Sequence, residues 1–155
     1  MEALVNEVVV SDEELARYRN EYTKAVREGT EVENVRFGYA WALVCTSNRR
    51  NINEGIEHLK DMLKNSKSHE TTRTYLYYLA VASAKMKDYR DSLNYIEALK
   101  RVDPNNSQMR QLEALVNKRI ERDGAVGAAV VGGAAVMGLA GIVGLGVLLA
   151  KGLKK

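Results

Sequence analysis

The sequence predicts an all-α protein in which a bundle of six helices precedes one C-terminal transmembrane helix. Apolar residues recur three and four positions apart through most of 11–123, which is the spacing of a single helix face. Nowhere do polar and apolar residues alternate with the period of two that a half-buried strand requires, so we expect no strand. The segment 124–150 contains no charged residue, although 28% of the whole chain is charged.

The first helix is expected between Ser11 and Gly29. Ser11 and Glu14 form a capping-box pattern, in which each side chain can bind a free amide of the first turn. Gly29 stands where a C-terminal cap belongs. The second helix is expected over about 31–47, where apolar residues including Tyr39 share one face.

The third helix is expected to begin at a second box-like cap, formed by Asn51 and Glu54 after the break NRRN. Another break, NSKSH, precedes a fourth helix over about 69–86. A fifth helix follows the turn at Asp88. After the turn DPNN, in which Pro104 is expected at the first position of a helix, the sixth helix continues to the uncharged segment.

Helices two to five form a repeat. YAWALV (39–44) matches YYLAVA (77–82) at a shift of 38 residues, and GIEHLKDML (55–63) matches SLNYIEALK (92–100) at a shift of 37. A helix pair that recurs at this period is typical of tetratricopeptide repeats. We therefore predict two tandem tetratricopeptide-like helix pairs, with the first and sixth helices as end caps.

The uncharged segment 124–150 is long enough to cross a membrane. As a helix it would extend about 40 Å at 1.5 Å per residue, whereas the hydrocarbon core of a bilayer is about 30 Å thick. A core helix of this length would need more protein around it than the preceding part of the chain supplies. Small residues four positions apart, such as Ala128 and Gly132, leave self-association into a homo-oligomer open.

Charge and topology indicate a tail-anchored membrane protein rather than one that binds nucleic acid. The net charge of +3 equals the three lysines at the end of the chain, a terminal group that offers no basic face to DNA or RNA. The N-terminus has no basic region of a signal peptide, so we expect the helical part to face the cytosol. The expected organisation is an N-terminal arm at 1–10, a helical domain at 11–123, an anchor at 124–150 that contacts the lipid bilayer, and a basic tail at 151–155 with Lys151, Lys154 and Lys155 as targeting residues.

The residue pattern does not indicate an enzyme. His58 and His69 are interpreted as solvated surface residues, because no group of Cys, His and carboxylate has the spacing of metal ligands. Cys45 has no base at a suitable spacing and is interpreted as a buried small apolar residue. No glycine-rich phosphate loop is present. We therefore expect no catalytic residue, no cofactor and no metal, and the single cysteine fits a reducing compartment.

The chain resembles the mitochondrial fission 1 protein family along its whole length. The stretches that carry the resemblance are MEALVNE, GYAWALV, NINEGIEHL, YLYYLAVASAKMKDYRDSLNYI, DPNN and DGAVGAAVVGGAAVMGLAG. It implies a cytosol-facing adaptor on the mitochondrial outer membrane, also found on peroxisomes, that recruits a dynamin-type GTPase, its adaptors or its regulators in organelle fission and turnover. Ala82 and Ala84 stand where the family often has glycine and tyrosine, which leaves open a paralogue with altered partners.

The candidate site is the inner surface formed by the first helix of each tetratricopeptide-like pair. An aromatic and apolar face with a few basic points suits an apolar or amphipathic helical peptide. The alternative for Tyr39, Leu43 and Tyr78 is that they only pack the core. The apolar arm is expected to fold over this groove and compete with partners through Leu4, Val5 and Val8. The groove residues are Arg36, Tyr39, Leu43, Tyr77, Tyr78, Val81 and Lys85.

Two other functions compete with the adaptor. A chaperone-docking receptor would grip a terminal carboxylate with lysine and asparagine side chains, but Tyr39 and Leu43 occupy the corresponding positions. A pore-forming helix would need polar residues along one side, and 124–150 has no charged lining. The chaperone-docking receptor is the alternative that we keep.

Overall fold

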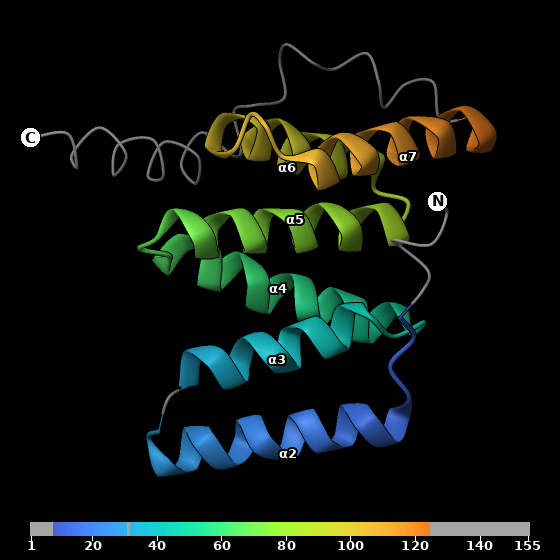
Figure 1. Cartoon of the computed structure of the whole chain (residues 1–155). Coiled ribbons are helices and arrows are strands. Elements are labelled where there is room, and N and C mark those ends of the chain that lie inside the picture. The colour runs from blue at the N-terminus through green and yellow to red at the C-terminus, as the bar shows by residue number, and fades with distance from the viewer. Residues whose placement is uncertain (1–7, 31, 125–155) are drawn as a thin grey trace, which may run out of the picture. The chain divides into compact units, whose positions relative to one another are not determined.

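The structure is a computed structural model that describes residues 8–30 and 32–124, and these residues form six α-helices and no strand. This confirms the predicted all-helical fold for the described part of the chain. The packing divides the chain into a first unit, Met1–Met62, and a second unit, Leu63–Lys155. The helices are α2 (Asp12–Glu28), α3 (Val32–Val44), α4 (Arg49–Asn65), α5 (His69–Lys85), α6 (Tyr89–Val102) and α7 (Ser107–Asp123) (Figure 1).

Helix α2 begins and ends as its sequence predicts. The Ser11 hydroxyl accepts a hydrogen bond of 3.2 Å from the amide of Glu14, and a Glu14 carboxylate oxygen accepts one of 3.1 Å from the amide of Ser11. This reciprocal pair is a complete capping box. At the other end Gly29 has a φ of 65°, a left-handed conformation that glycine adopts without steric cost, and its amide binds the carbonyl of Ala25.

Helices α2 and α3 run in opposite directions and share the core of the first unit (Figure 1). Their apolar faces meet because the residues at helical spacing on each helix form one continuous stripe. Partly buried aromatic rings surround this core. Its buried residues are Val10, Leu15, Tyr39, Ala42 and Leu43, and Tyr18, Tyr22 and Trp41 pack against them.

Helix α4 begins two residues earlier than the expected cap at Asn51. The side-chain oxygen of Asn48 accepts a hydrogen bond of 2.9 Å from the amide of Arg50, and the helix starts at Arg49. The box-like pattern of Asn51 and Glu54 is therefore not a cap. The Glu54 carboxylate binds the hydroxyl of Tyr39 instead of an amide of its own helix.

Gly55 sets the close approach of α4 to α3. A Cβ atom at this position would lie 2.7 Å from Cγ1 of Val44, 2.9 Å from the carbonyl oxygen of Ala40 and 3.0 Å from Cβ of Leu43. Only a residue without a side chain fits here, because no contact with a real Cβ is this short. The crossing therefore explains a glycine inside a helix, where it weakens the helix by about 1 kcal/mol relative to alanine.

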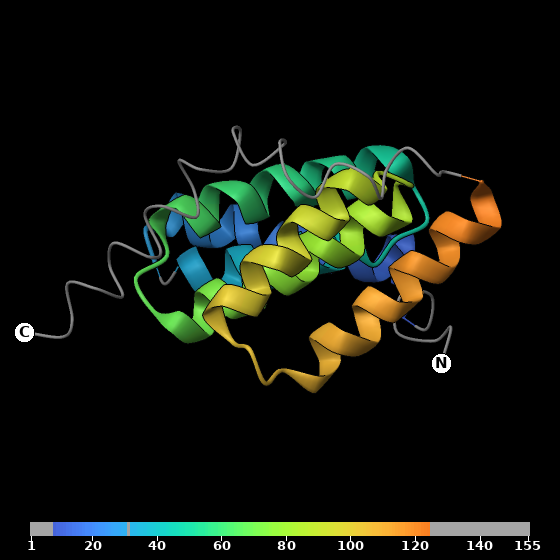
Figure 2. The same ribbon diagram turned by 90° about the horizontal axis from the view of Figure 1, so that it is seen from above.

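In the second unit, α5 and α6 pack closely and α6 packs against α7 (Figure 2). Ser92 is fully buried between the first two, and its hydroxyl donates a hydrogen bond of 2.8 Å to the carbonyl of Ala80. Ser92 follows Gly55 by 37 positions, which equals the shift of the sequence repeat. Each helix pair thus has a small residue at the equivalent place in its second helix.

The turn between α6 and α7 differs from the prediction that Pro104 is the first residue of a helix. Helix α7 begins at Ser107, and the side-chain oxygen of Asn106 accepts a hydrogen bond of 2.9 Å from the amide of Met109. Asparagine is a strong N-cap residue, so the helix begins after Asn106 and Pro104 lies in the turn.

Helix α7 ends at Gly124, which has a φ of 67° and whose amide binds carbonyls of the last turn. The predicted anchor beyond Gly124 and the basic tail lie outside the described residues. Of the helices in 8–30 and 32–124, none has both the length and the apolar character needed to cross a membrane.

Candidate functional site

The groove residues of the first unit lie on α3. Leu43 is fully buried and Tyr39 is 3% exposed, and both pack against α2 in the core described above. Arg36 is half-buried. In this conformation Arg36 alone of the three has substantial accessible surface, and partner contact at the other two stays a prediction.

The hydroxyl of Tyr39 joins all three helices of the first unit. It donates a hydrogen bond of 2.6 Å to a carboxylate oxygen of Glu54 on α4 and accepts one of 2.9 Å from Nε of Arg19 on α2. A buried hydroxyl needs such partners, since an unpaired one would lose its hydration without compensation. Burial raises the pKa of Tyr39, and the hydrogen bond to Glu54 raises it further.

Three rings pack together beside this hydroxyl. The rings of Tyr22 and Tyr39 stack, with centroids 5.4 Å apart and planes 18° from parallel. The imidazole of His58 meets both edge-on, at 5.5 Å from each. Aromatic pairs with these geometries contribute about 0.5–1.5 kcal/mol beyond their buried area.

His58 is not the solvated residue that the sequence predicted. It is half-buried, and its Nδ1 accepts a hydrogen bond of 3.1 Å from Nε of Arg36. The same guanidinium forms an ion pair of 2.7 Å with Asp61 through Nη1. Burial lowers the pKa of His58, and the positive charge of Arg36 lowers it further.

One feature of the sequence could have located this cluster. Glu54, His58 and Asp61 are spaced four and three apart, so they lie on one face of α4. All three have partners on α3, namely Tyr39 and Arg36. Titratable residues with helical spacing beside a predicted core tyrosine are typical of a polar contact between helices.

The groove residues of the second unit lie on α5. Val81 is buried, whereas Tyr77, Tyr78 and Lys85 are half-buried. The two tyrosine rings meet edge-on with centroids 5.4 Å apart and planes 85° from parallel. Burial raises the pKa of Tyr77. Tyr77 and Tyr78 are thus only partly accessible, and their contact with a partner stays a prediction.

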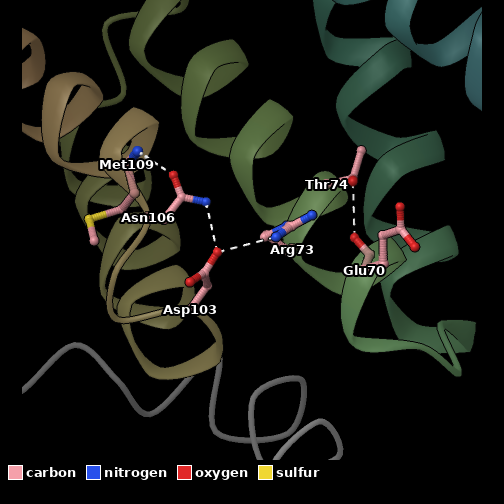
Figure 3. A network of polar contacts seen from close by, with 6 residues as sticks. All are labelled: Glu70, Arg73, Thr74, Asp103, Asn106 and Met109. Atoms are coloured by element: carbon pink, nitrogen blue, oxygen red, sulfur yellow. Dashed lines mark hydrogen bonds and ion pairs between the residues drawn. The ribbon is translucent and has the colours of Figure 1, made fainter.

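Figure 3 shows how polar contacts hold the first turns of α5. Arg73 forms an ion pair of 3.3 Å with Asp103 at the end of α6, and the amide nitrogen of the Asn106 side chain donates to the same carboxylate at 3.1 Å. Thr74 also donates to the carbonyl of Glu70 at 3.0 Å. The helix that carries Tyr77 is therefore tied to the turn between α6 and α7.

The end of the N-terminal arm is fixed to α3. Val10 is 6% exposed, and its amide donates a hydrogen bond of 3.2 Å to the carbonyl of Cys45. Val8 is 54% exposed. The other arm residues, Leu4 and Val5, lie outside the described residues, as do the targeting residues Lys151, Lys154 and Lys155.

The chemistry of this site suits protein binding. In the part of the chain that the structure describes, no three His, Cys, Asp or Glu side chains are grouped to hold a metal ion. The half-buried groove residues on α5 are two phenol rings and an ammonium group. Aromatic rings with a basic residue at the edge are typical of a surface that binds an apolar or amphipathic peptide.

Comparison with known proteins gives two family matches. Residues 34–66 match the Fis1 N-terminal tetratricopeptide repeat, and residues 73–125 match the Fis1 C-terminal tetratricopeptide repeat. The chain is 39% identical over 133 residues to the Mitochondrial fission 1 protein of Homo sapiens, covering 86% of each protein. It is 41% identical over 94 residues to the FIS1-related protein fis-1 of Caenorhabditis elegans, covering 61% of this chain and 66% of the relative.

Solved structures show the same fold. A crystal structure of yeast Fis1 in complex with an Mdv1 fragment has a TM-score of 0.67 and 24% identity, covering 75% of this chain and 89% of that one. A crystal structure of the fission protein Fis1 from Saccharomyces cerevisiae has a TM-score of 0.65 and 25% identity, covering 76% of this chain and 89% of that one. The described helices therefore have the fold of these solved structures.

Proposed function

Because the chain belongs to the mitochondrial fission 1 protein family, we propose that it is a tail-anchored adaptor of the mitochondrial outer membrane that recruits a dynamin-type GTPase, or the adaptors and regulators of that enzyme. The chain is a tetratricopeptide fission adaptor and not an enzyme. The observation that carries the proposal is the identity of 39% to the human relative over 86% of both chains. We extend the role to peroxisomes and to organelle turnover.

The proposed partner surface is centred on α5. Tyr77, Tyr78 and Lys85 combine aromatic area with a cation, which suits a helical segment with an apolar face. The yeast relative in complex with a coiled-coil fragment of Mdv1 supports a helical ligand. Contact with Tyr39 or Leu43 would require α2 or the end of the arm to move away from α3, because these cover both side chains.

We propose that the arm 1–10 folds over the groove residues and competes with partners. Val10 packs in one core cluster with the groove residues Tyr39 and Leu43, and this supports the proposal for the first unit. The tether to Leu4, Val5 and Val8 is then short, and the effective concentration of the arm is on the order of millimolar. Since Val10 belongs to the core, the deletion that tests this idea removes 1–7 and keeps Val10.

The membrane part of the proposal rests on the composition of 124–150 and 151–155. An uncharged segment of this length crosses the bilayer as a helix, and the three lysines follow it directly. With the helical domain in the cytosol, the partner surface meets soluble proteins at the membrane. The targeting lysines belong to this proposal as well.

Binding to the full-length protein tests the proposed function. The chain in lipid nanodiscs is titrated with a dynamin-related GTPase and with a coiled-coil adaptor fragment from the same organism. Tyr77→Ala is expected to weaken binding by about tenfold or more, as truncation of a central aromatic does. The matched control is Asn117→Ala, an exposed position on α7. Equal affinity of the two variants, or no binding by the parent protein, would contradict the proposal.

A further inference from the structure

The first unit contains a cluster in which α2, α3 and α4 meet at one imidazole. We call it the His58 cluster. The charged and titratable side chains around His58 come from all three helices, and none of them belongs to the surface on α5. Its members are Arg19 and Tyr22 of α2, Arg36 and Tyr39 of α3, and Glu54, His58 and Asp61 of α4.

We propose that His58 is a pH-sensitive switch: the neutral imidazole holds α3 against α4 and α2, and protonation at mildly acidic pH loosens this contact. The switch is a property of the first unit alone. It does not depend on which partner the protein binds, so it can be tested separately from the proposed function.

The geometry requires a neutral imidazole. Nδ1 of His58 accepts a hydrogen bond of 3.1 Å from Nε of Arg36, so the proton of the neutral ring is on Nε2. Protonation would add a donor at Nδ1 and remove this acceptor. It would also place an imidazolium against a guanidinium at hydrogen-bond distance, which is a repulsive pair.

The nearby carboxylates are already bound to other groups. Asp61 forms an ion pair of 2.7 Å with Arg36, and Glu54 accepts a hydrogen bond of 2.6 Å from the hydroxyl of Tyr39. Both attract an imidazolium, but each would have to leave a short hydrogen bond to reach it. Burial of the ring and the positive charge of Arg36 have a larger effect than the two carboxylates, so the pKa of His58 is lowered.

The stability of the first unit depends on pH because His58 binds a proton more weakly in the folded protein than in the unfolded chain. A histidine in an unfolded chain has a pKa of about 6.5, and the pKa of His58 in the folded protein lies below that value. Between the two values the unfolded or opened state takes up the proton first. The stabilisation is therefore complete above the unfolded pKa and is lost as the pH falls towards the pKa of the folded state.

The helix that the switch loosens is the one that carries Tyr39 and Leu43. Arg36 and Tyr39 are one turn apart on α3, so loss of the bond from Arg36 to His58 frees the same side of the helix on which Tyr39 stacks with Tyr22. Mild acidification is thus expected to increase the mobility of α3 and the exposure of this face.

The test uses the full chain in detergent micelles. The imidazole chemical shifts of His58 are followed by NMR against pH. Amide exchange protection in α3 and α4 is compared at about pH 7.5 and about pH 5.5, on either side of the reference pKa of 6.5. We expect His58 to titrate below 6.5, with protection in α3 falling by up to tenfold for each unit of that shift.

Two variants distinguish the protonation of His58 from other effects of acid on the amide exchange of α3. His58→Gln retains an acceptor for Arg36 and cannot titrate, so its protection in α3 should not change between the two pH values. His69→Gln should behave like the parent protein. Titration of His58 at or above 6.5, or a pH-dependent loss of protection that persists in His58→Gln, would overturn the proposal. The pH titration of the His58 chemical shifts in the parent protein tests the proposal even if His58→Gln folds poorly.

Discussion

The carbonyl oxygen of Ala40 lies 2.9 Å from the place that a Cβ atom on Gly55 would occupy. Helices α3 and α4 therefore touch through their backbones at this point. The neighbouring atom is part of the main chain, so it cannot rotate away as a flexible side chain does. This contact sets the distance between the two helices on which the His58 cluster depends.

Gly55→Ala is expected to destabilise the first unit by roughly 1–2 kcal/mol. Overpacking costs about 1–3 kcal/mol, and the upper part of that range, about 2–3 kcal/mol, applies here because one of the atoms that the new Cβ meets belongs to the main chain. The better helix propensity of alanine contributes about 1 kcal/mol in the opposite direction. Urea unfolding of the full chain in micelles measures the change. The control is Gly38→Ala on α3, where the new Cβ would meet ring atoms of Tyr18 at an ordinary 3.5 Å. An equally stable Gly55→Ala protein would contradict the close approach.

Tyr39→Phe is expected to lower the free energy of unfolding by about 1–3 kcal/mol, because it removes a hydroxyl that is hydrogen-bonded to two charged groups. The ring and its stack with Tyr22 remain, so the loss reports the contacts to Arg19 and Glu54. The matched control is Tyr22→Phe, which retains the stack and should change the stability by about 0.5 kcal/mol or less. Equal effects of the two variants would contradict the bridging role of the Tyr39 hydroxyl.

Asp123 is expected to remain ionised in strongly acidic solution. The Tyr89 hydroxyl donates to it at 2.5 Å, and Arg122 and Lys87 donate as well, which together lower its pKa to about 2. The hydrogen bonds to the Asp123 carboxylate stabilise the folded protein fully above the ordinary carboxyl pKa. This stabilisation is lost as the pH falls through about 2. In Tyr89→Phe the pKa of Asp123 should rise towards 3.8, as carboxyl NMR shifts would show. An unchanged pKa would mean that the hydroxyl does not bind this carboxylate in solution.

Val10 and Val8 should respond differently to truncation. Val10→Ala removes buried methyl groups and is expected to lower stability by about 1.5 kcal/mol, at ~0.8 kcal/mol for each buried carbon. Val8→Ala changes an exposed side chain and should stay within about 0.5 kcal/mol. Thermal or urea unfolding of the two variants gives the comparison. A neutral Val10→Ala would place the whole arm outside the core.

Local and periodic features could be predicted from the sequence. The capping box of Ser11 depends on residues three apart, and the small residues Gly55 and Ser92 recur with the repeat, so both can be recognised without a structure. The predictions for Asn51 and Pro104 were wrong because a nearby asparagine competed as the cap in each case. A pattern of residue types does not decide between two caps a few positions apart.

For the His58 cluster, helical spacing shows that Glu54, His58 and Asp61 share a face of α4, but it does not show which residues of α3 they contact. Arg36 and His58 are 22 positions apart, and their contact depends on the distance and rotation of α3 against α4. The burial of Tyr39 likewise depends on α2 and Val10, which come from outside the repeat. Contacts between helices follow from packing, whereas helical spacing shows only which residues share a face.

The central claim is that the chain works as a fission adaptor at the mitochondrial surface, and imaging tests it most directly. A fluorescent protein is fused to the N-terminus of the full chain and of a form without residues 125–155, and location and mitochondrial shape are scored in cells. We expect the full chain to surround mitochondria and fragment their network, and the shortened form to be cytosolic and without effect. Location of the full chain on the endoplasmic reticulum, or an unchanged mitochondrial network, would contradict the account.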